Sequence, residues 1–533
     1  MPKIAELQGA PPNDKVLPFR ESLMATLGVG FVGMLVALDE TVVSTALPMV
    51  MAELQGFKYY AQVATAYLLT SVITVPVFGR LGDYYGRKPF VLASIVVFSV
   101  ASALCGMAPS MPFLVLARAL QGIGGGMLVG TAFACIADLF PDSHARLHWQ
   151  MMLSAAFGVA NAVGPSLGGL LTEWYGWRAV FYVNLPVGVL GLWFAWRYLP
   201  HLRQQTHRGP IRVDWLGAVL IAAGLGSLQM SVELLSARGL DAYTAALLAL
   251  ASVALAALWQ WERRCANPIL PVEMFREPAL APLFKLAVFT GFAMFALLLY
   301  APLLFQVGFG YSPKQAGVLI TPLVVCIPVG SVLNGRIVTR IRHPNNMLYA
   351  GFGILALSCL GLSQATRCMP HGVLMAIMLV GGLGLGFIMP NLTVFAQQTA
   401  EREHLGITTA MLQSLHMVGG MVGTAIVGTL LTRSYTGGVE QALASANANQ
   451  WMSRMADPQV LIDKASQVVL LGQLEQAGHN GALLLEQARV SMVGSIHLSF
   501  LVAGAAAVLG VWSAREVPPI KLRRGLAPAM AAD

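Results

Sequence analysis

The chain has 533 residues, of which 56% are apolar and only 11% are charged, and its mean hydropathy is +0.67. A soluble globular protein carries about 25% charged residues, so the composition excludes that class and predicts a polytopic membrane protein. The net charge of +8 follows from Lys and Arg gathered in one set of loops, so a nucleic-acid partner need not be invoked.

Fourteen apolar stretches approach or exceed the roughly 20 residues that a bilayer span needs. They are 23–46, 60–81, 89–108, 112–134, 149–172, 179–198, 213–235, 241–261, 283–305, 315–338, 346–366, 371–396, 406–432 and 490–512. The two tails, 1–22 and 513–533, the even-numbered loops and the ends of the stretches that adjoin those loops hold 23 of the 33 Lys and Arg residues, and the odd-numbered loops hold nine. The positive-inside rule therefore predicts that both tails are cytoplasmic. The first stretch has no small-residue cleavage site, so we expect a retained span rather than a signal peptide.

Two neighbouring acids, Asp39 and Glu40, lie in the first stretch. A charge at the bilayer centre costs about 2.5 to 3.5 kcal/mol, so the presence of each acid in a span calls for a structural or functional explanation. Adjacent side chains on a helix point about 100° apart, so at most one faces the centre of a cavity. We favour Asp39, because Thr41 and Ser44 leave a polar surface partly shared with it. Burial disfavours the charged form of a carboxylate, so Asp39 is a candidate proton carrier; the alternative is a structurally paired acid near the outer interface.

This first stretch resembles the first-helix signature of the fourteen-helix drug:proton antiporters, the EmrB/QacA type of the major facilitator superfamily. The matching residues are Leu38, Asp39, Thr41, Val42, Val43, Ala46, Leu47 and Pro48, and Ser44 stands where the pattern usually has Asn. The resemblance covers about 23–512. It implies an all-α major facilitator fold of two six-helix bundles plus two inserted helices, and it also selects Asp39.

A short polar turn joins the second and third stretches. Its distinctive residues are Gly79, Gly82, Asp83, Gly86, Arg87 and Lys88. The glycines permit a sharp turn and close backbone approach, and the Asp83 carboxylate can accept from helix N-terminal amides or from Arg87. The turn resembles the corresponding loop of the superfamily, which implies a gating latch at the cytosolic face. An ordinary charged hairpin is the alternative.

Arg118 lies inside the fourth stretch, where its guanidinium stays charged and needs a partner. The pattern Arg-x-x-Gln-Gly, completed by Gln121, resembles a family motif associated with proton coupling. That resemblance implies that Arg118 acts on a nearby carboxylate, with Asp39 as our candidate, and we place Gln121 at the substrate cavity. An architectural Arg bonded to backbone carbonyls is the alternative.

The fifth stretch carries small residues from Gly158 to Gly169, which permit close helix contact. It resembles the antiporter motif of the superfamily's exporters. The resemblance assigns gating to four residues, namely Gly164, Pro165, Gly168 and Gly169. Pro165 is expected to bend the helix, and Asn161 is a candidate cavity residue.

Glycine patterns recur at long range, which predicts a duplication. Gly122, Gly124 and Gly126 recur as Gly382, Gly384 and Gly386, Gly164 and Gly169 recur as Gly423 and Gly428, and Gly79 recurs as Gly335. The predicted bundles are 23–198 and 283–512, with two inserted helices in 213–261. A substrate site is then expected between the bundles near the bilayer midplane.

The second half offers fewer polar candidates. His416 lies about ten residues into its stretch, and an imidazole exchanges protons near neutral pH, so it is either a proton relay or a hydrogen-bonded core residue. Gln306, Asn391 and Gln413 are further candidates for the substrate cavity. The long outer segment 433–489 predicts one or two amphipathic helices. It resembles the EmrB type, which implies docking of a periplasmic adaptor; a cap over the outer vestibule is the alternative.

The source of energy follows from what the sequence lacks. It contains no Gly-x-x-x-x-Gly-Lys-Ser/Thr and no soluble domain long enough to hydrolyse a nucleotide, so we expect coupling to a proton gradient and no cofactor. His144 and His148 have only Asp142 beside them, so no metal site is predicted, and no nucleophile and base pattern suggests an enzyme.

These observations together predict a proton-coupled antiporter of a bacterial cytoplasmic membrane. It would expel amphipathic or cationic drugs by alternating access, with protons, the lipid bilayer and small-molecule substrates as its partners. A dedicated exporter of one endogenous metabolite, siderophore or lipid is the nearest alternative. A non-transporting membrane receptor or scaffold is the alternative from another class.

Overall fold

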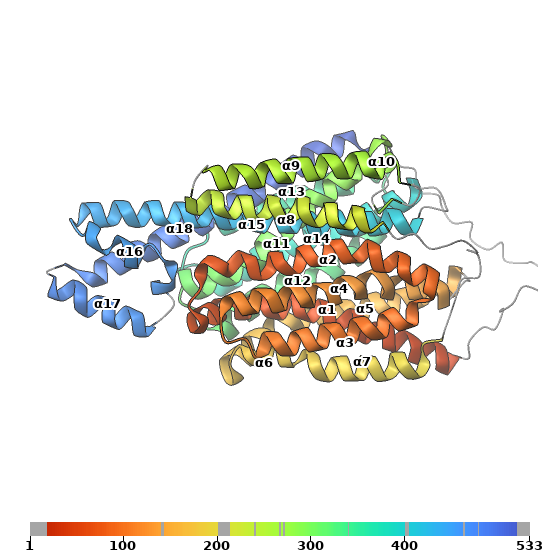
Figure 1. Ribbon diagram of the computed structural model, residues 1–533, viewed down its shortest axis with the longest axis horizontal. Coiled ribbons are helices and arrows are strands. Elements are labelled where there is room, and N and C mark those ends of the chain that lie inside the picture. The colour runs from red at the N-terminus through yellow and green to blue at the C-terminus, as the bar shows by residue number, and fades with distance from the viewer. Residues whose placement is uncertain are drawn as a thin grey trace, which may run out of the picture.

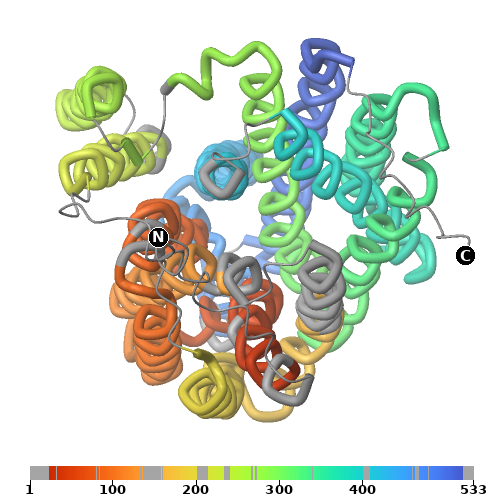
Figure 2. Tube along the Cα trace, turned by 90° about the vertical axis from the view of Figure 1, so that its right-hand side faces the viewer, coloured from red at the N-terminus to blue at the C-terminus, as the bar shows by residue number. Residues whose placement is uncertain are grey.

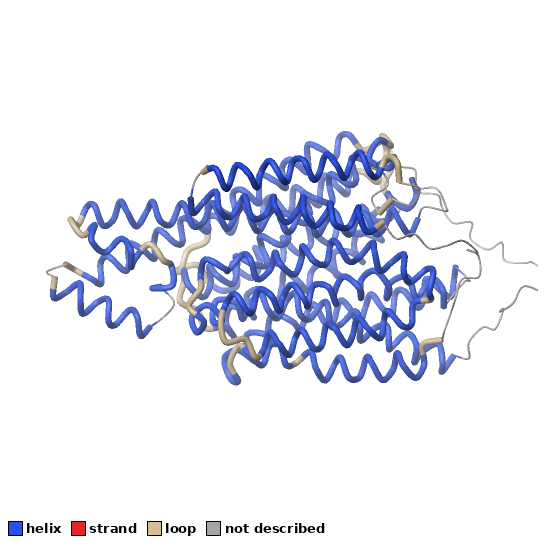
Figure 3. The backbone as a smooth tube through the Cα atoms, in the orientation of Figure 1, coloured by secondary structure: helices blue, strands red, loops and turns tan. Residues whose placement is uncertain are grey.

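The regular structure of the chain is helical throughout the part that the computed structural model describes (Figure 3). The described residues are 19–139, 143–200, 214–238, 241–265, 268–269, 272–338, 340–399, 405–461, 464–477 and 479–519. Within them, thirteen helices are long and apolar enough to cross a membrane. They account for thirteen of the predicted stretches, and the remaining one, 149–172, lies on a helix of Ser143–Tyr175. The structure thus confirms an all-α fold with many candidate membrane spans.

The helices form two bundles with an inserted pair between them in the sequence (Figure 1). The N-terminal half contains α1 Phe19–Leu54, α2 Tyr60–Tyr85, α3 Arg87–Gly106, α4 Met111–Leu139, α5 Ser143–Tyr175, α6 Arg178–Tyr182 and α7 Asn184–Tyr198. The insert is α8 Trp215–Arg238 and α9 Ala242–Glu262. The C-terminal half contains α11 Ala281–Leu303, α12 Pro313–Val338, α13 Asn346–Ser363, α14 His371–Thr399, α15 Leu405–Ser445 and α18 Gly481–Ser513. Seen end-on, the red-to-yellow and green-to-blue helices form two groups, with α8 and α9 to one side (Figure 2).

Gly122 and its repeat Gly382 occupy equivalent places in the two halves. A Cβ atom at Gly122 of α4 would lie 2.3 Å from the carbonyl oxygen of Tyr67 in α2, and one at Gly382 of α14 would lie 2.0 Å from that of Leu323 in α12. Because each glycine lets its helix touch the backbone of the neighbouring helix, the pair α2 and α4 corresponds to the pair α12 and α14. This correspondence supports the predicted duplication.

The second pair of glycine repeats relates the surfaces where the halves meet. Gly169 of α5 lies against the backbone of Pro313 in α12, whereas Gly428 of α15 lies against Tyr300 and against Ala61 of α2. The halves therefore touch along two seams, α5 with α12 and α2 with α15. The two seams are related as a pseudo-twofold axis requires.

The inserted helix α8 covers the second of these seams. It packs on α9, α2 and α15. The Gln229 side-chain amide of α8 donates to the hydroxyl of Thr65 in α2, and the Thr429 hydroxyl of α15 donates to the carbonyl oxygen of Val232 in α8 at 3.0 Å. One helix of the insert is therefore bonded to both halves.

The segment 433–489 lies beyond one end of the bundle (Figure 1). Much of it continues the spans themselves, because α15 runs on to Ser445 and α18 starts at Gly481. Between them lie the short α16 (Met452–Met455) and α17 (Lys464–Gln476). The Tyr435 hydroxyl donates to the carbonyl oxygen of Met455 at 2.8 Å. We call residues 433–489 the helical extension. Its short helices are folded against the ends of α15 and α18.

Candidate functional site

An ion pair lies in the core of the N-terminal half. The Arg118 guanidinium of α4 donates through Nη1 to Oδ2 of Asp39 in α1 at 2.5 Å. The two residues are 4% and 1% exposed, so both charges have been taken out of water. Breaking such a pair by removing one partner costs about 3 to 5 kcal/mol. The partner that the sequence demanded for Arg118 is therefore Asp39.

Three amide and guanidinium groups donate to the Asp39 carboxylate. Its Oδ1 accepts from Nε2 of Gln121 at 2.7 Å and from Nδ2 of Asn184 at 3.1 Å, while Oδ2 holds Arg118. Gln121 in turn accepts from Arg118 at 2.7 Å. Such a network holds a carboxylate in one position. Four helices, α1, α4, α7 and α3, supply it, since Asn184 also donates to the Ser102 hydroxyl at 3.0 Å.

The Arg118 guanidinium is also tied to α2. Its Nε donates to the carbonyl oxygen of Val63 at 3.3 Å, and its Cζ lies 4.5 Å from the centre of the Tyr67 ring. A guanidinium over an aromatic face gains a cation–π attraction. Arg118 thus bonds both to a carboxylate and to a backbone carbonyl oxygen, and its role in proton coupling stays a prediction.

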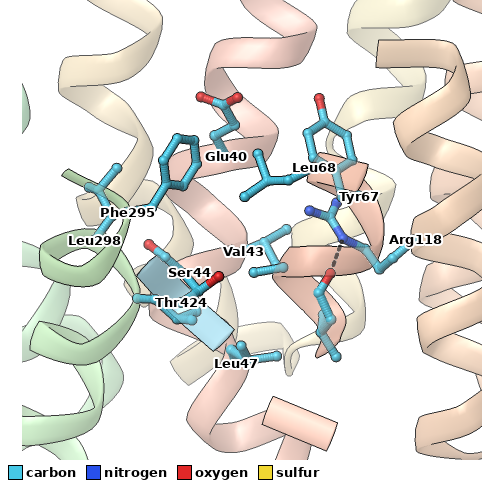
Figure 4. A pocket seen from close by; sticks show the side chains of 13 residues that line it. Glu40, Val43, Ser44, Leu47, Tyr67, Leu68, Arg118, Phe295, Leu298 and Thr424 are labelled. Atoms are coloured by element: carbon cyan, nitrogen blue, oxygen red, sulfur yellow. Dashed lines mark hydrogen bonds between the residues drawn. The ribbon is translucent and has the colours of Figure 1, made fainter. Parts of the chain in front are cut away.

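A central cavity lies beside this ion pair, between the two halves (Figure 4). Nine of its lining residues come from α1, α2 and α4, including Glu40, Ser44, Tyr67 and Arg118. The C-terminal half supplies the other four, Phe295, Leu298, Leu299 and Thr424. The cavity measures about 40 Å³, whereas small-molecule pockets have about 300 to 1,000 Å³. A drug-sized ligand therefore needs the halves to move apart from this arrangement.

The acid that faces the central cavity is Glu40, and our expectation that Asp39 would face it is wrong. Glu40, Val43, Ser44 and Leu47 all line the cavity, which is the i, i+3, i+4, i+7 spacing of one helix face. Asp39 points away from them into the N-terminal bundle, where its partners lie. Ser44 stands four residues after Glu40 and five after Asp39, so its polar surface belongs to Glu40.

Thr41 does not line the central cavity either. Its hydroxyl donates to the carbonyl oxygen of Ala37 at 2.9 Å, and a Cβ at Gly164 of α5 would lie 1.8 Å from the Thr41 hydroxyl oxygen. Thr41 thus packs against the small-residue face of α5. Gln121, which we also expected at the cavity, is instead a bonded member of the Asp39 network.

The remaining cavity candidates are dispersed. The Gln306 amide donates to the backbone oxygen of Thr45 at 2.7 Å, across the two halves. Asn391 is buried and donates to Oδ1 of Asn334 at 2.8 Å, inside the C-terminal half. Asn161 and Gln413 are half-buried on α5 and α15. None of these candidates lines the central cavity, because long-range helix packing, which the sequence does not give, sets their facing.

His416 is buried behind the cavity wall. Its ring packs edge-on against Phe295 with centroids 5.9 Å apart, and its Nε2 has no hydrogen-bond partner among the described residues. Phe295 lines the central cavity, and His416 does not. No hydrogen bond in the described part of the chain joins His416 to Asp39 or Arg118, so its role as a proton relay stays a prediction.

The polar turn between α2 and α3 is built on Gly86. Its φ of +86° lies in the left-handed region that glycine adopts freely, and it ends α2 and precedes α3. The Lys88 ammonium donates to the carbonyl oxygen of Trp196 in α7 at 2.8 Å. A Cβ at Gly82 would lie 3.3 Å from Cγ of Arg87, and one at Gly79 would lie 3.5 Å from the carbonyl oxygen of Gly130 in α4. The Asp83 side chain lies outside the described residues.

The α5 motif lies between the two halves. On one side, a Cβ at Gly168 would lie 2.6 Å from a carbonyl oxygen of α1. On the other side, the carbonyl oxygen of Pro165 is the nearest atom, at 2.2 Å, to a Cβ built at Gly317 of α12. The hydroxyls of Ser166 and Thr321 share a hydrogen bond of 2.6 Å between α5 and α12. A side chain at Gly168 would therefore push α5 away from α1 within the N-terminal half, whereas one at Gly317 would push the two halves apart.

Hydrogen bonds between the halves gather toward the end that carries the helical extension. The Tyr60 hydroxyl of α2 donates to the carbonyl oxygen of Leu299 in α11 at 2.5 Å. The Ser312 hydroxyl, just before α12, donates to the Glu173 carboxylate of α5 at 2.7 Å. Tyr300 lies 5.7 Å from Tyr60, ring centre to ring centre. In this conformation the halves are joined at that end.

Sequence reasoning missed three polar contributors to the site: Asn184, Ser102 and the hydroxyl of Tyr67. Asn184 had a usable signal, since it is an amide at the start of an otherwise apolar stretch, where burial demands a partner. Ser102 and Tyr67 had none, because hydroxyl groups are common within spans and those of Ser often bond to their own helix.

Comparison with known proteins gives the same architecture. A family model described as Major Facilitator Superfamily matches residues 29–424. The chain is 30% identical to Multidrug resistance protein 3 of Bacillus subtilis (strain 168), over 90% of this chain and 93% of that protein. It is 30% identical to the tetracenomycin C resistance and export protein of Streptomyces glaucescens, over 92% and 90% of the two chains.

Solved structures show the same fold at low identity. A bacterial homolog of the human lysosomal transporter Spinster, in an inward-facing and unoccupied conformation, superposes with a TM-score of 0.58 at 16% identity, over 94% of this chain and 98% of that one. A mutant of the nucleoside transporter NupG gives 0.60 at 10% identity, over 92% and 99%. Since the family model covers most of this chain, it is a multi-pass membrane transporter and belongs to the major facilitator superfamily.

Proposed function

We propose that this transporter is a proton-coupled antiporter that expels amphipathic or cationic drugs and other toxic compounds. Relatives at 28 to 34% identity are named as multidrug or antibiotic resistance proteins, which supports the drug-efflux part of the proposal. The observation that carries the coupling part is the buried Asp39–Arg118 pair at 2.5 Å, because one of its members also lines the central cavity.

Arg118 connects the proton site to the substrate site. While Asp39 is ionised, its charge balances that of Arg118. A proton on Asp39 removes this balance and leaves Arg118 as an uncompensated cation at the cavity wall. A cationic substrate in the cavity is then repelled, so a proton on Asp39 and a cation in the cavity oppose each other. Competition of this kind, combined with alternating access of the halves, is antiport.

The energy available fits an exchange of one proton for one substrate molecule. One charge that falls through 100 mV supplies about 2.3 kcal/mol. At about 1.4 kcal/mol per factor of ten, one proton sustains roughly a fiftyfold gradient of a neutral substrate.

Topology and partners are part of the same proposal. The Lys and Arg distribution favours both tails in the cytoplasm of a bacterial cell, so the helical extension would lie on the outer side of the membrane. Removal of residues 449–477 distinguishes its two candidate roles. If the extension docks a periplasmic adaptor, transport in liposomes persists while drug resistance of cells falls. If it caps the vestibule, transport changes in liposomes as well.

The decisive experiment follows proton release from acid-interior proteoliposomes when a drug is added outside. We expect release with the wild type and none with Asp39→Asn, because the amide keeps the shape of the side chain but cannot bind and release a proton. Asp241→Asn is the matched control, because Asp241 caps α9 through the Thr244 amide at 2.8 Å and Asn caps equally well. No release from a folded, drug-binding wild type would contradict proton coupling and favour a uniporter or receptor.

A further inference from the structure

The two neighbouring acids of α1 have different environments. Asp39 is 1% exposed, and its two carboxylate oxygens accept from Arg118, Gln121 and Asn184. Glu40 is half-buried, lines the central cavity and accepts no hydrogen bond from the described residues. A carboxylate that is partly removed from water and has no hydrogen-bond donor is stabilised when a positive group approaches it. Within the described part of the chain, Glu40 therefore lacks the hydrogen-bond donors and the positive partner that Asp39 has.

A second polar group in the same cavity is also unsatisfied. The Tyr67 hydroxyl is buried and has no hydrogen-bond partner among the described residues. In Figure 4 this hydroxyl and the Glu40 carboxylate lie toward the same end of the cavity. A buried donor left unpaired costs about 1 to 3 kcal/mol. The Tyr67 oxygen and the Glu40 carboxylate together give this end of the cavity oxygen atoms that suit a positively charged group.

The C-terminal half completes the surroundings with apolar and aromatic atoms. Phe295 lies beside Glu40 (Figure 4), and Leu298 and Leu299 extend that wall. An aromatic ring attracts a cation through its face, and leucines accept apolar substituents but offer no charge. Arg118 is the one cation in this lining, and Asp39 balances its charge. The lining is thus suited to a positive charge that apolar groups surround.

We propose that Glu40 binds the positive charge of the transported compound, separately from the proton chemistry of Asp39. The Tyr67 hydroxyl and the Phe295 ring complete a site for lipophilic monovalent cations. This inference rests on the proposed function for its place in a transport cycle. Glu40 decides which substrates are held, whereas Asp39 decides whether a proton is exchanged for them.

Direct binding to the full-length protein in detergent tests this assignment. The probes are tetraphenylphosphonium and its neutral relative triphenylphosphine oxide, followed by equilibrium dialysis. We expect Glu40→Gln to weaken tetraphenylphosphonium binding about tenfold or more and to change triphenylphosphine oxide binding less than about twofold, as loss of a charge-assisted contact predicts. Glu40→Asp should retain part of the preference. Glu440→Gln, which removes an exposed carboxylate from the helical extension, should leave both affinities unchanged.

Three results would overturn the assignment. They are unchanged tetraphenylphosphonium binding in Glu40→Gln, an equal loss for both probes, which would mean a structural role, and a wild type that does not bind the cation. Binding in detergent needs no gradient, so its outcome is independent of proton release. If the proteoliposomes release no protons while Glu40→Gln still loses the cation selectively, the proposed antiport fails and the cation site stands.

Discussion

The two halves of the molecule share one backbone plan but differ in what they bury. The N-terminal half holds a network of charged and amide groups around Asp39 and Arg118, whereas the C-terminal half holds a neutral pair, Asn334 and Asn391, in its core. At the central cavity the C-terminal half contributes mainly Phe295 and leucines. The comparison teaches that a duplicated scaffold can differ between its copies in buried charge, since among the described residues the buried ion pair lies in the N-terminal half.

The largest expected effect comes from breaking the ion pair. Arg118→Gln leaves the Asp39 carboxylate buried without its cation, and we expect the free energy of unfolding to fall by about 3 to 5 kcal/mol, with loss of transport. Thermal unfolding in detergent measures the first effect. The double variant Asp39→Asn with Arg118→Gln should regain much of the stability and none of the transport; a double variant as unstable as the single one would contradict the pairing.

The next effect tests the shared backbone plan. Gly122→Ala and Gly382→Ala each place a methyl group within 2.3 Å of a carbonyl oxygen in the neighbouring helix, and overpacking of this kind costs up to about 3 kcal/mol. Both substitutions should lower the unfolding temperature similarly. Gly335→Ala has nothing within 4 Å of its new Cβ and should be neutral or slightly stabilising. A large fall in unfolding temperature in only one of the first two variants would contradict the equivalence of the two helix pairs.

A smaller effect is expected from the neutral pair of the C-terminal half. Asn391→Leu leaves Asn334 without the donor that now lies 2.8 Å from its Oδ1, which costs about 1 to 2 kcal/mol. Drug-evoked proton release should persist, because no charge is lost. If proton release disappears while the protein remains folded, proton chemistry is not confined to the N-terminal half.

The smallest effect concerns the inserted helix. Gln229→Leu removes the side-chain bond from α8 to Thr65, and we expect a loss of about 1 kcal/mol, measured by thermal unfolding. Ser252→Ala on α9, an exposed hydroxyl bonded within its own helix, is the control. Equal stability of the two variants would show that α8 is not held to the N-terminal half by this contact.

Sequence patterns predicted the fold well because hydrophobic length and glycine spacing are local properties. The stretch 112–134 and its repeat at 371–396 need no knowledge of their neighbours to be recognised as spans. Pairing of Arg118 with an acid was predictable too, since a guanidinium in a span cannot remain alone. It was harder to predict which of the two acids faces the cavity. Asp39 and Glu40 differ by one residue, and only the helix face shared with Ser44 and Leu47 separates them.

The prediction that certain amide side chains line the cavity was wrong for a different reason. Gln306, Asn391 and Gln413 were chosen by polarity alone, yet polarity does not say which neighbour a helix face meets. Asn391 found its partner inside its own half, and Gln306 found a backbone oxygen across the seam. Pairing between distant helices decides such cases, and it becomes visible only in the assembled fold.

The position of α8 makes the molecule's two flanks unequal toward the surrounding lipid. The seam between α2 and α15 is covered by a helix that is bonded to Thr65 on one side and to Thr429 on the other. The seam between α5 and α12 closes directly, through glycine contacts and the hydroxyls of Ser166 and Thr321. Rocking of the halves must stretch or exchange the α8 bonds on one flank only. A lipophilic molecule that enters sideways from the bilayer therefore meets an extra helix on the α8 flank and a thinner wall at α5.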